Sequence, residues 1–186
     1  RGPRSGHAAG ICRILETARK VFGACGTENG FLYCAVPADC IVSFGWGWDF
    51  RRMHPEWPVS AFCDRQLPIW QLALHGLVVI EGDGLNWPAV MHKVAFGLHP
   101  RTEWSAHPGI HPVLDDAMIA ALKADYDLVL KRFGSLQKLR MTDWRTDGKT
   151  VATRYEDGTE VIADYGRERL TVNGGNVPRP AALLPT

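Results

Sequence analysis

Apolar residues repeat at helical spacing in three segments of the chain. In residues 6–20 they recur with a period near 3.6, which predicts an amphipathic helix whose apolar face consists of Ala9, Ile11, Cys12, Leu15, Ala18 and, just beyond, Phe22. Asn86 is the predicted N-cap of a second helix that runs to about residue 97. Asp115 caps the most regular one, over residues 116–133, which Gly134 is expected to stop.

Short, continuous apolar runs between these helices predict buried strands. Residues 21–25 form the first run, and shorter pieces follow at residues 31–36 and 41–44. The run LPIWQLALHGLVVI, residues 67–80, is interrupted only by His75-Gly76. Strands this apolar are typical of a parallel sheet, in which both faces are buried.

The sequence pattern changes after Gly134 and becomes typical of β strands. Turns are expected at Asp147-Gly148 and Asp157-Gly158, and strands at residues 140–146, 151–155, 159–165 and 170–172. The tail VPRPAALLPT carries three prolines, which suits an edge strand or a strap across this β module. The sequence therefore predicts an α/β domain over residues 1–134 and an all-β domain over residues 135–186.

The balance of charge argues against two classes of partner. The 186 residues include 21 Lys and Arg against 20 Asp and Glu, so no basic surface is expected for nucleic acid or for an anionic membrane. A transmembrane helix would need a run of about 18 apolar residues, and the chain has none. It opens RGPRSGHAAG, without an initiator Met or a signal-peptide pattern, so we expect the natural N-terminus upstream and leave the cellular location open.

The cysteines and histidines do not predict a metal site. No CxxC pair occurs among Cys12, Cys25, Cys34, Cys40 and Cys63, so we expect buried thiols in a reducing compartment and not a disulfide framework or a zinc site. His99, His107 and His111 are spaced eight and four apart, but no predicted helix carries them. We therefore expect neither a metal nor a cofactor.

Glu28 is the strongest candidate for chemistry. It follows the run at residues 21–25 and lies between two glycines, at the edge where a parallel sheet or barrel binds ligands. The aromatic residues that follow, separated by glycines, are Phe44, Trp46 and Trp48. Their flat apolar faces suit a sugar ring. The alternative is a carboxylate that caps a turn, beside ordinary core aromatics.

Four further side chains are candidate substrate contacts, namely Asp49, His75, Asp83 and Trp87. Asp49 belongs to a Gly- and Pro-rich segment that is predicted to be a long loop, where a solvated side chain is the alternative. His75 interrupts an apolar run, where the alternative is a core histidine. Asp83 follows the next strand, and because successive parallel strands end at one face, we expect it on the same side as Glu28.

Three blocks of the sequence resemble bacterial glycoside hydrolases related to endo-α-N-acetylgalactosaminidase and α-N-acetylgalactosaminidase. The blocks are VFGACGTENGFLYCAVPADC, LPIWQLALHGLVV and, after a helical segment, LRMTDWRTDGKTVATRYEDGTEVIADYG. Together they are scattered over most of the chain. The resemblance implies the C-terminal portion of a (β/α)8 barrel, followed by a small antiparallel β-sandwich domain.

The resemblance also implies roles for individual residues. In that family a barrel strand ends in a Glu that serves as the general acid/base, and Glu28 in the GTENG block matches it. The nucleophilic Asp ends the preceding strand. One βα unit takes on the order of 30 residues, so this Asp is expected upstream of Arg1. The family's His-Asp pair is matched by His75-Gly76, so its Asp is replaced here. The implied activity is retaining hydrolysis of α-linked sugars, and this chain alone is expected to be inactive.

The chemistry fits these residue types. A retaining glycosidase uses two carboxylates about 5 Å apart, one as nucleophile and one as proton donor. The donor must be neutral at the working pH, and apolar neighbours such as Phe31, Trp46 and Trp48 would raise the pKa of Glu28 by desolvation.

Two other functions fit the same residues. The first is a carbohydrate-binding protein without catalysis, in which Trp46, Trp48 and Trp87 stack on sugar while Glu28 and Asp83 accept hydrogen bonds from its hydroxyls. The second is a purely structural module, in which no carboxylate faces the Trp cluster. An oligosaccharide or glycoside is the expected partner in the enzyme and in the binding protein.

Overall fold

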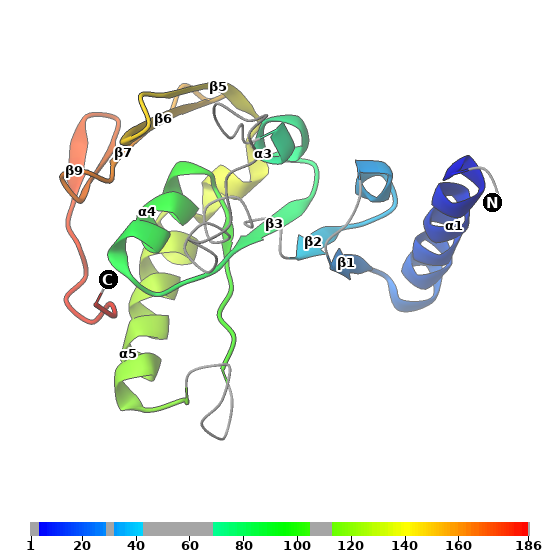
Figure 1. Cartoon of the computed structure of the whole chain (residues 1–186), viewed down its shortest axis with the longest axis horizontal. Coiled ribbons are helices and arrows are strands. Elements are labelled where there is room, and N and C mark those ends of the chain that lie inside the picture. The colour runs from blue at the N-terminus through cyan, green and yellow to red at the C-terminus, as the bar shows by residue number, and fades with distance from the viewer. Residues whose placement is uncertain (1–3, 29–31, 43–68, 105–112, 186) are drawn as a thin grey trace, which may run out of the picture. The chain divides into compact units, whose positions relative to one another are not determined.

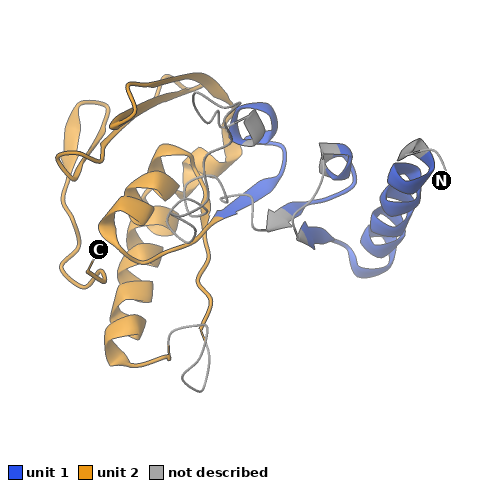
Figure 2. Ribbon diagram, in the orientation of Figure 1, with its two compact units in different colours: residues 1–81 blue, residues 82–186 orange. Residues whose placement is uncertain are grey.

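The computed structural model describes residues 4–28, 32–42, 69–104 and 113–185 (Figure 1). The chain divides into two compact units, residues 1–81 and residues 82–186, which are coloured separately in Figure 2. None of the described helices is both long enough and apolar enough to cross a membrane.

In its described residues, the first unit contains three short parallel strands. Its elements are the helix α1, the strand β1, a 3-10 turn η1, the strand β2, the helix α3 and the strand β3, with bounds Arg4–Phe22, Gly26–Glu28, Leu32–Ala35, Cys40–Val42, Ile69–Leu74 and Val79–Gly82. The last residue of β3, Gly82, begins the second unit. β2 lies between β1 and β3 and runs parallel to both, so the three carboxyl ends share one edge of the sheet.

The predicted N-terminal helix is confirmed as α1, but its end and its buried face differ from the prediction. Val21 and Phe22, which were expected in a strand, complete the last helical turn. Gly23 then ends the helix with a φ of 84°, a conformation that suits glycine, and its N–H donates to the carbonyl of Arg19 at 2.9 Å. The prediction that Phe22 lies on the buried face is wrong, because this side chain is 81% exposed.

The apolar run at residues 67–80 was predicted to form strands, and this holds only for its second part. Ile69–Leu74 form the helix α3, while Val79–Gly82 form β3, which is parallel to β2 as expected. Gly76, with a φ of 79°, lies between the two elements. A short apolar run does not by itself distinguish a helix from a buried strand, and that ambiguity explains the error.

The second unit pairs helices with an antiparallel sheet. Its elements are α4, β4, α5, a π-helix η2, a 3-10 helix η3 and the strands β5 to β9, with bounds Trp87–Ala95, His99–Pro100, Asp116–Asp125, Tyr126–Arg132, Gly134–Lys138, Met141–Thr146, Thr150–Tyr155, Glu160–Asp164, Arg169–Val172 and Gly175–Val177. β5 to β9 are antiparallel neighbours in chain order.

Both predicted helix caps in this unit are confirmed. The side chain of Asn86 accepts a hydrogen bond from the Ala89 N–H at 3.0 Å, and that of Asp115 accepts one from the Met118 N–H at 2.8 Å. The helix that begins after Asp115 changes from α to π geometry at residue 126. The predicted end of this helix is confirmed, because Phe133 is its C-cap and Gly134 follows as the first residue of the separate 3-10 helix η3.

The predicted β strands and turns are confirmed, and the tail begins in an edge strand, which is one of its two expected arrangements, while the strap across the β module is not seen in the described residues. Gly148 and Gly158 lie in the turns with φ values of 90° and 86°. β9 is the edge strand of the sheet. The tail then passes over the start of α4, where the Leu184 N–H donates to the Leu85 carbonyl at 3.0 Å.

One face of the antiparallel sheet packs on α4 (Figure 1). The inward residues Tyr155, Val161 and Leu170 are at most 1% exposed. Within the described residues the antiparallel strands form this single sheet. The barrel and the β-sandwich therefore stay predictions, and the predicted domain boundary at residue 134 falls inside the second unit.

Two hydroxyl groups of the sheet satisfy the last carbonyl of α4. The Ala95 carbonyl accepts hydrogen bonds from Thr153 Oγ1 at 2.6 Å and from Tyr155 Oη at 2.9 Å. Carbonyls in the last turn of a helix have no partner within the helix. The sheet therefore completes the hydrogen bonding of α4, as well as covering it.

We expect the substitutions Thr153→Val and Tyr155→Phe to be superadditive. Each alone costs about 1 kcal/mol of unfolding free energy, because the other hydroxyl still satisfies the Ala95 carbonyl. The double variant leaves a buried carbonyl without a donor, so it costs about 1 kcal/mol more than the sum. Urea denaturation of the four proteins measures the coupling, and strict additivity would contradict the shared-acceptor arrangement.

His92, in α4, contacts the residue that follows β7. Its Nδ1 lies 3.3 Å from the hydroxyl of Tyr165, and its ring packs against Phe96 with centroids 4.6 Å apart. Burial, together with the positive charge of Lys93, lowers the pKa of His92 to about 4. The imidazole is therefore neutral in the folded chain at neutral pH.

Stability should fall as the pH drops from about 6.5 to about 4. The unfolded chain takes up a proton on His92 near pH 6.5, whereas the folded chain does so only near pH 4. The neutral state of His92 contributes about 3 kcal/mol to the free energy of unfolding. This contribution is present in full above pH 6.5 and is lost as the pH falls to about 4. Urea midpoints between pH 7.5 and pH 4 measure it. The control is the double variant His92→Phe, Tyr165→Phe. If its urea midpoint fell with pH as steeply as that of the wild type, groups other than His92 would cause the loss of stability.

Candidate functional site

Glu28 is the last residue of β1, at the edge shared by the carboxyl ends of the parallel strands. Its backbone pairs with Val42, and one residue earlier in the ladder Ile41 pairs with Ile80. Continuing this register places Glu81 opposite Val42. Glu28 and Glu81 thus occupy the same row, with β2 between them. The side chain of Glu28 lies outside the described part of the structure.

The thiol of Cys40 engages the carboxylate of Glu81. Cys40 Sγ donates to Glu81 Oε1 at 3.7 Å. Burial, with a smaller contribution from the charge of Glu81, raises the pKa of Cys40 to about 11. The thiol therefore keeps its proton at neutral pH and acts as a hydrogen-bond donor, not as a nucleophile.

Asp83 and Arg101 form an ion pair just beyond the ends of β3 and β4. Arg101 Nη1 lies 3.1 Å from Asp83 Oδ2 and 3.4 Å from Oδ1, and Nη2 donates to Glu103. The side chain of Asp83 is 41% exposed and that of Arg101 is 21% exposed, so both reach solvent. Partial burial raises the pKa of Asp83, although the guanidinium of Arg101 opposes the rise and the carboxylate of Glu103 adds to it.

The chemistry of this arrangement suits hydroxyl-bearing groups. A solvent-accessible carboxylate accepts hydrogen bonds from hydroxyl groups, and a guanidinium beside it donates them. Because the guanidinium lies between two carboxylates, its direction is fixed before a ligand arrives.

The loop that carries Asp83 is tightly packed at both of its glycines. A Cβ on Gly82 would lie 2.8 Å from Lys93 Cγ, and a Cβ on Gly84 would lie 2.7 Å from the Cβ of Ala89. Gly84 also has a φ of 93°. Only glycine satisfies both the positive φ and the close approach at this position.

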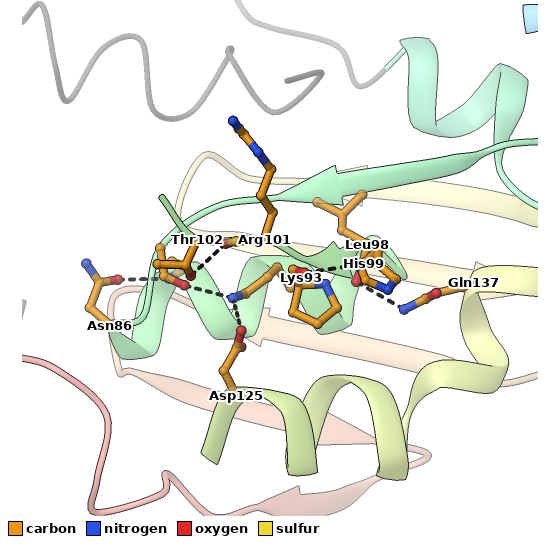
Figure 3. Close-up of polar contacts among 11 residues, drawn as sticks. Asn86, Lys93, Leu98, His99, Arg101, Thr102, Asp125 and Gln137 are labelled. Atoms are coloured by element: carbon orange, nitrogen blue, oxygen red, sulfur yellow. Dashed lines mark hydrogen bonds and ion pairs between the residues drawn. The ribbon is translucent and has the colours of Figure 1, made fainter. Parts of the chain in front are cut away.

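A buried ion pair lies under this loop (Figure 3). Lys93 Nζ donates to the carbonyl of Gly84 at 2.7 Å and to Asp125 Oδ2 at 2.5 Å. The side chains of Lys93 and Asp125 are 0% and 2% exposed. Burial raises the pKa of Asp125 while the ammonium of Lys93 lowers it. The other carboxylate oxygen, Oδ1, is buried without a hydrogen-bond partner among the described residues.

The structure changes the interpretation of two predicted contacts. Trp87 was expected to stack on sugar, but it is 1% exposed and its Nε1 donates to the Glu168 carbonyl at 2.6 Å, so it is a core residue. His75 is 5% exposed, which favours the alternative of a core histidine. The remaining predicted contacts that lie outside the described residues are Trp46, Trp48 and Asp49.

Sequence reasoning missed Arg101, Lys93 and Asp125. The two buried charges had a signal, because Lys93 follows Val90 by three residues and Asp125 follows Ala121 by four, which are positions on apolar helix faces. Charged residues at such positions on consecutive helices indicate a buried pair. Arg101 had no comparable signal, because it belongs to a loop that was considered only for its histidines.

Comparison with known proteins adds no assignment. No protein-family model matches the chain, and no curated protein and no solved structure is significantly similar to it. The resemblance to glycoside hydrolases therefore stays a prediction. Among the described residues, no group of three His, Cys, Asp or Glu side chains could hold a metal ion, and His107 and His111 lie outside them.

We expect opposite changes in the pKa of Asp83 when its two charged neighbours are removed. Arg101→Met should raise this pKa, because the guanidinium stabilises the carboxylate, whereas Glu103→Gln should lower it, because a negative charge is removed. Carbon-detected NMR titration of the Asp83 carboxyl measures both shifts. Arg145→Met, on an exposed strand position, is the control and should leave it unchanged. Shifts of the same sign would contradict the arrangement.

Proposed function

We propose that this chain belongs to a retaining glycoside hydrolase that acts on α-linked sugars, with Glu28 as the general acid/base. The observation that carries the proposal is the position of Glu28 at the carboxyl end of a parallel strand whose neighbours are also parallel. In α/β enzymes this edge is where ligands bind and where catalytic residues are found. The match of the GTENG block to the family's acid/base supports the same role.

Each residue has a proposed role in this reaction. Glu28 protonates the leaving oxygen in the first step and activates water in the second. The nucleophilic carboxylate is proposed to come from a strand that precedes residue 1. Asp83, held by Arg101, is proposed to bind sugar hydroxyls, a role that its exposed carboxylate supports.

A carbohydrate-binding protein without catalysis has less support. That alternative used three tryptophans as stacking platforms, and Trp87 is buried and hydrogen-bonded. Trp46 and Trp48 would have to supply all of the stacking.

Glu28→Gln should reduce turnover of a substrate with a poor leaving group far more than turnover of an activated aryl glycoside. Protonation assists departure only when the leaving oxygen is basic, so the loss for a sugar leaving group is about 10²–10⁴-fold in the first step. The assay uses a longer chain that includes the strand proposed to supply the nucleophile. With the aryl glycoside the glycosyl-enzyme should accumulate, and azide, which needs no deprotonation, should restore turnover.

Glu16→Gln is the matched control, because Glu16 is an exposed residue of α1. This variant should turn over both substrates at the wild-type rate. If Glu28→Gln also left the turnover of both substrates unchanged, Glu28 would be a turn carboxylate and the proposed mechanism would be wrong.

A further inference from the structure

Asp83 lies between two residues that Lys93 contacts. The aliphatic part of Lys93 packs against Gly82, where an added Cβ would lie 2.8 Å from Lys93 Cγ. The ammonium at the other end of the same side chain donates to the carbonyl of Gly84 at 2.7 Å. One side chain therefore contacts the backbone on both sides of Asp83.

The ammonium is itself fixed from α5. Asp125 Oδ2 lies 2.5 Å from Lys93 Nζ, and neither side chain is more than 2% exposed (Figure 3). With the cation held at this point, the Gly84 carbonyl can be satisfied only if the loop stays where it is.

The pair is poorly explained by stability alone. A buried ion pair is often no more stabilising than apolar side chains of similar volume. Here the balance is less favourable still, because Asp125 Oδ1 has no hydrogen-bond partner among the described residues. What apolar side chains could not provide is the hydrogen bond to Gly84.

We infer that Lys93 is a positioning residue for Asp83. It holds the Gly82-Asp83-Gly84 loop on α4 and thereby keeps the Asp83 carboxylate against Arg101, in the geometry available to a hydroxyl-bearing ligand. The inference rests on the proposed function only for the ligand. The placement of Asp83 by Lys93 can be tested without any substrate.

The informative variant is Lys93→Met combined with Asp125→Leu, which fills the space and leaves no buried charge unpaired. We expect its melting temperature to stay within a few degrees of the wild type, while the loop loosens. Two amides report on the loop, because the Arg101 N–H donates to the Gly82 carbonyl and the Leu184 N–H to the Leu85 carbonyl. Both should exchange with solvent at least tenfold faster.

The Asp83 carboxyl provides a second readout. If the loop opens, the side chain becomes hydrated and its pKa falls toward the ordinary value of about 3.9. Met91→Leu is the matched control, because Met91 is a fully buried residue of α4 with no polar side-chain atom to hold the loop. It should change neither the exchange rates nor the pKa.

A folded double variant with wild-type exchange at both amides and an Asp83 pKa that is unchanged or higher would overturn the inference, because the ammonium of Lys93 lowers this pKa and its removal from a closed loop would raise it. If the variant does not fold, the wild-type chain decides by native-state exchange in low urea. The Arg101 and Leu184 amides should then exchange with the same urea dependence as the core amide of Val94. If exchange of the Arg101 and Leu184 amides did not depend on urea, the loop would open without disturbing Lys93. This result would also overturn the inference. A failed Glu28→Gln assay affects neither readout, so failure of the two proposals can be told apart.

Discussion

The second unit is organised around the buried ammonium group of Lys93. An ammonium removed from water is unfavourable by several kcal/mol unless it is paired and hydrogen-bonded. Lys93, which is fully buried, meets this requirement with one carboxylate from α5 and one carbonyl from the loop after β3. The loop after β3, α4 and α5 must therefore be in place together. The glycines of the loop follow from the same constraint, because a side chain on Gly82 would collide with the lysine stem.

α4 transmits this constraint to the rest of the unit. Its N-terminal residue, Trp87, donates to the Glu168 carbonyl, and its last carbonyl, on Ala95, accepts from two hydroxyls of β6. Hydrogen bonds are directional, so these contacts fix the rotation of α4 against the sheet, which apolar packing alone would specify less narrowly. The strands after residue 134 thus contribute to the position of the loop that carries Asp83.

The elements that could be predicted from the sequence are those with local signals. The caps Asn86 and Asp115 and the Asp-Gly turns each specify a backbone conformation with a few neighbouring residues, and they were read correctly. The helix at Ile69–Leu74 could not be predicted, because a short apolar run has the same composition in a buried helix and in a buried strand. Arg101 could not be identified, since its partner Asp83 is 18 residues away and is brought to it only by tertiary structure, in which the Arg101 N–H donates to the Gly82 carbonyl.

The parallel sheet restricts which carboxylate can serve as the nucleophile in the proposed mechanism. Glu28 and Glu81 are separated by β2, so their Cα atoms lie roughly 9–10 Å apart at the usual strand spacing. Retaining glycosidases hold their two carboxyl groups about 5 Å apart, and one oxygen of Glu81 is already engaged by Cys40. Two Glu side chains can span part of this Cα separation, so the observation that argues against Glu81 as the nucleophile is its engagement by Cys40. A strand adjacent to β1 on the side away from β2 would lie about 5 Å from it, and in the described residues that edge of β1 is unpaired. The proposed mechanism takes its nucleophile from a preceding parallel strand, and this edge of β1 is the one at which such a strand would pair.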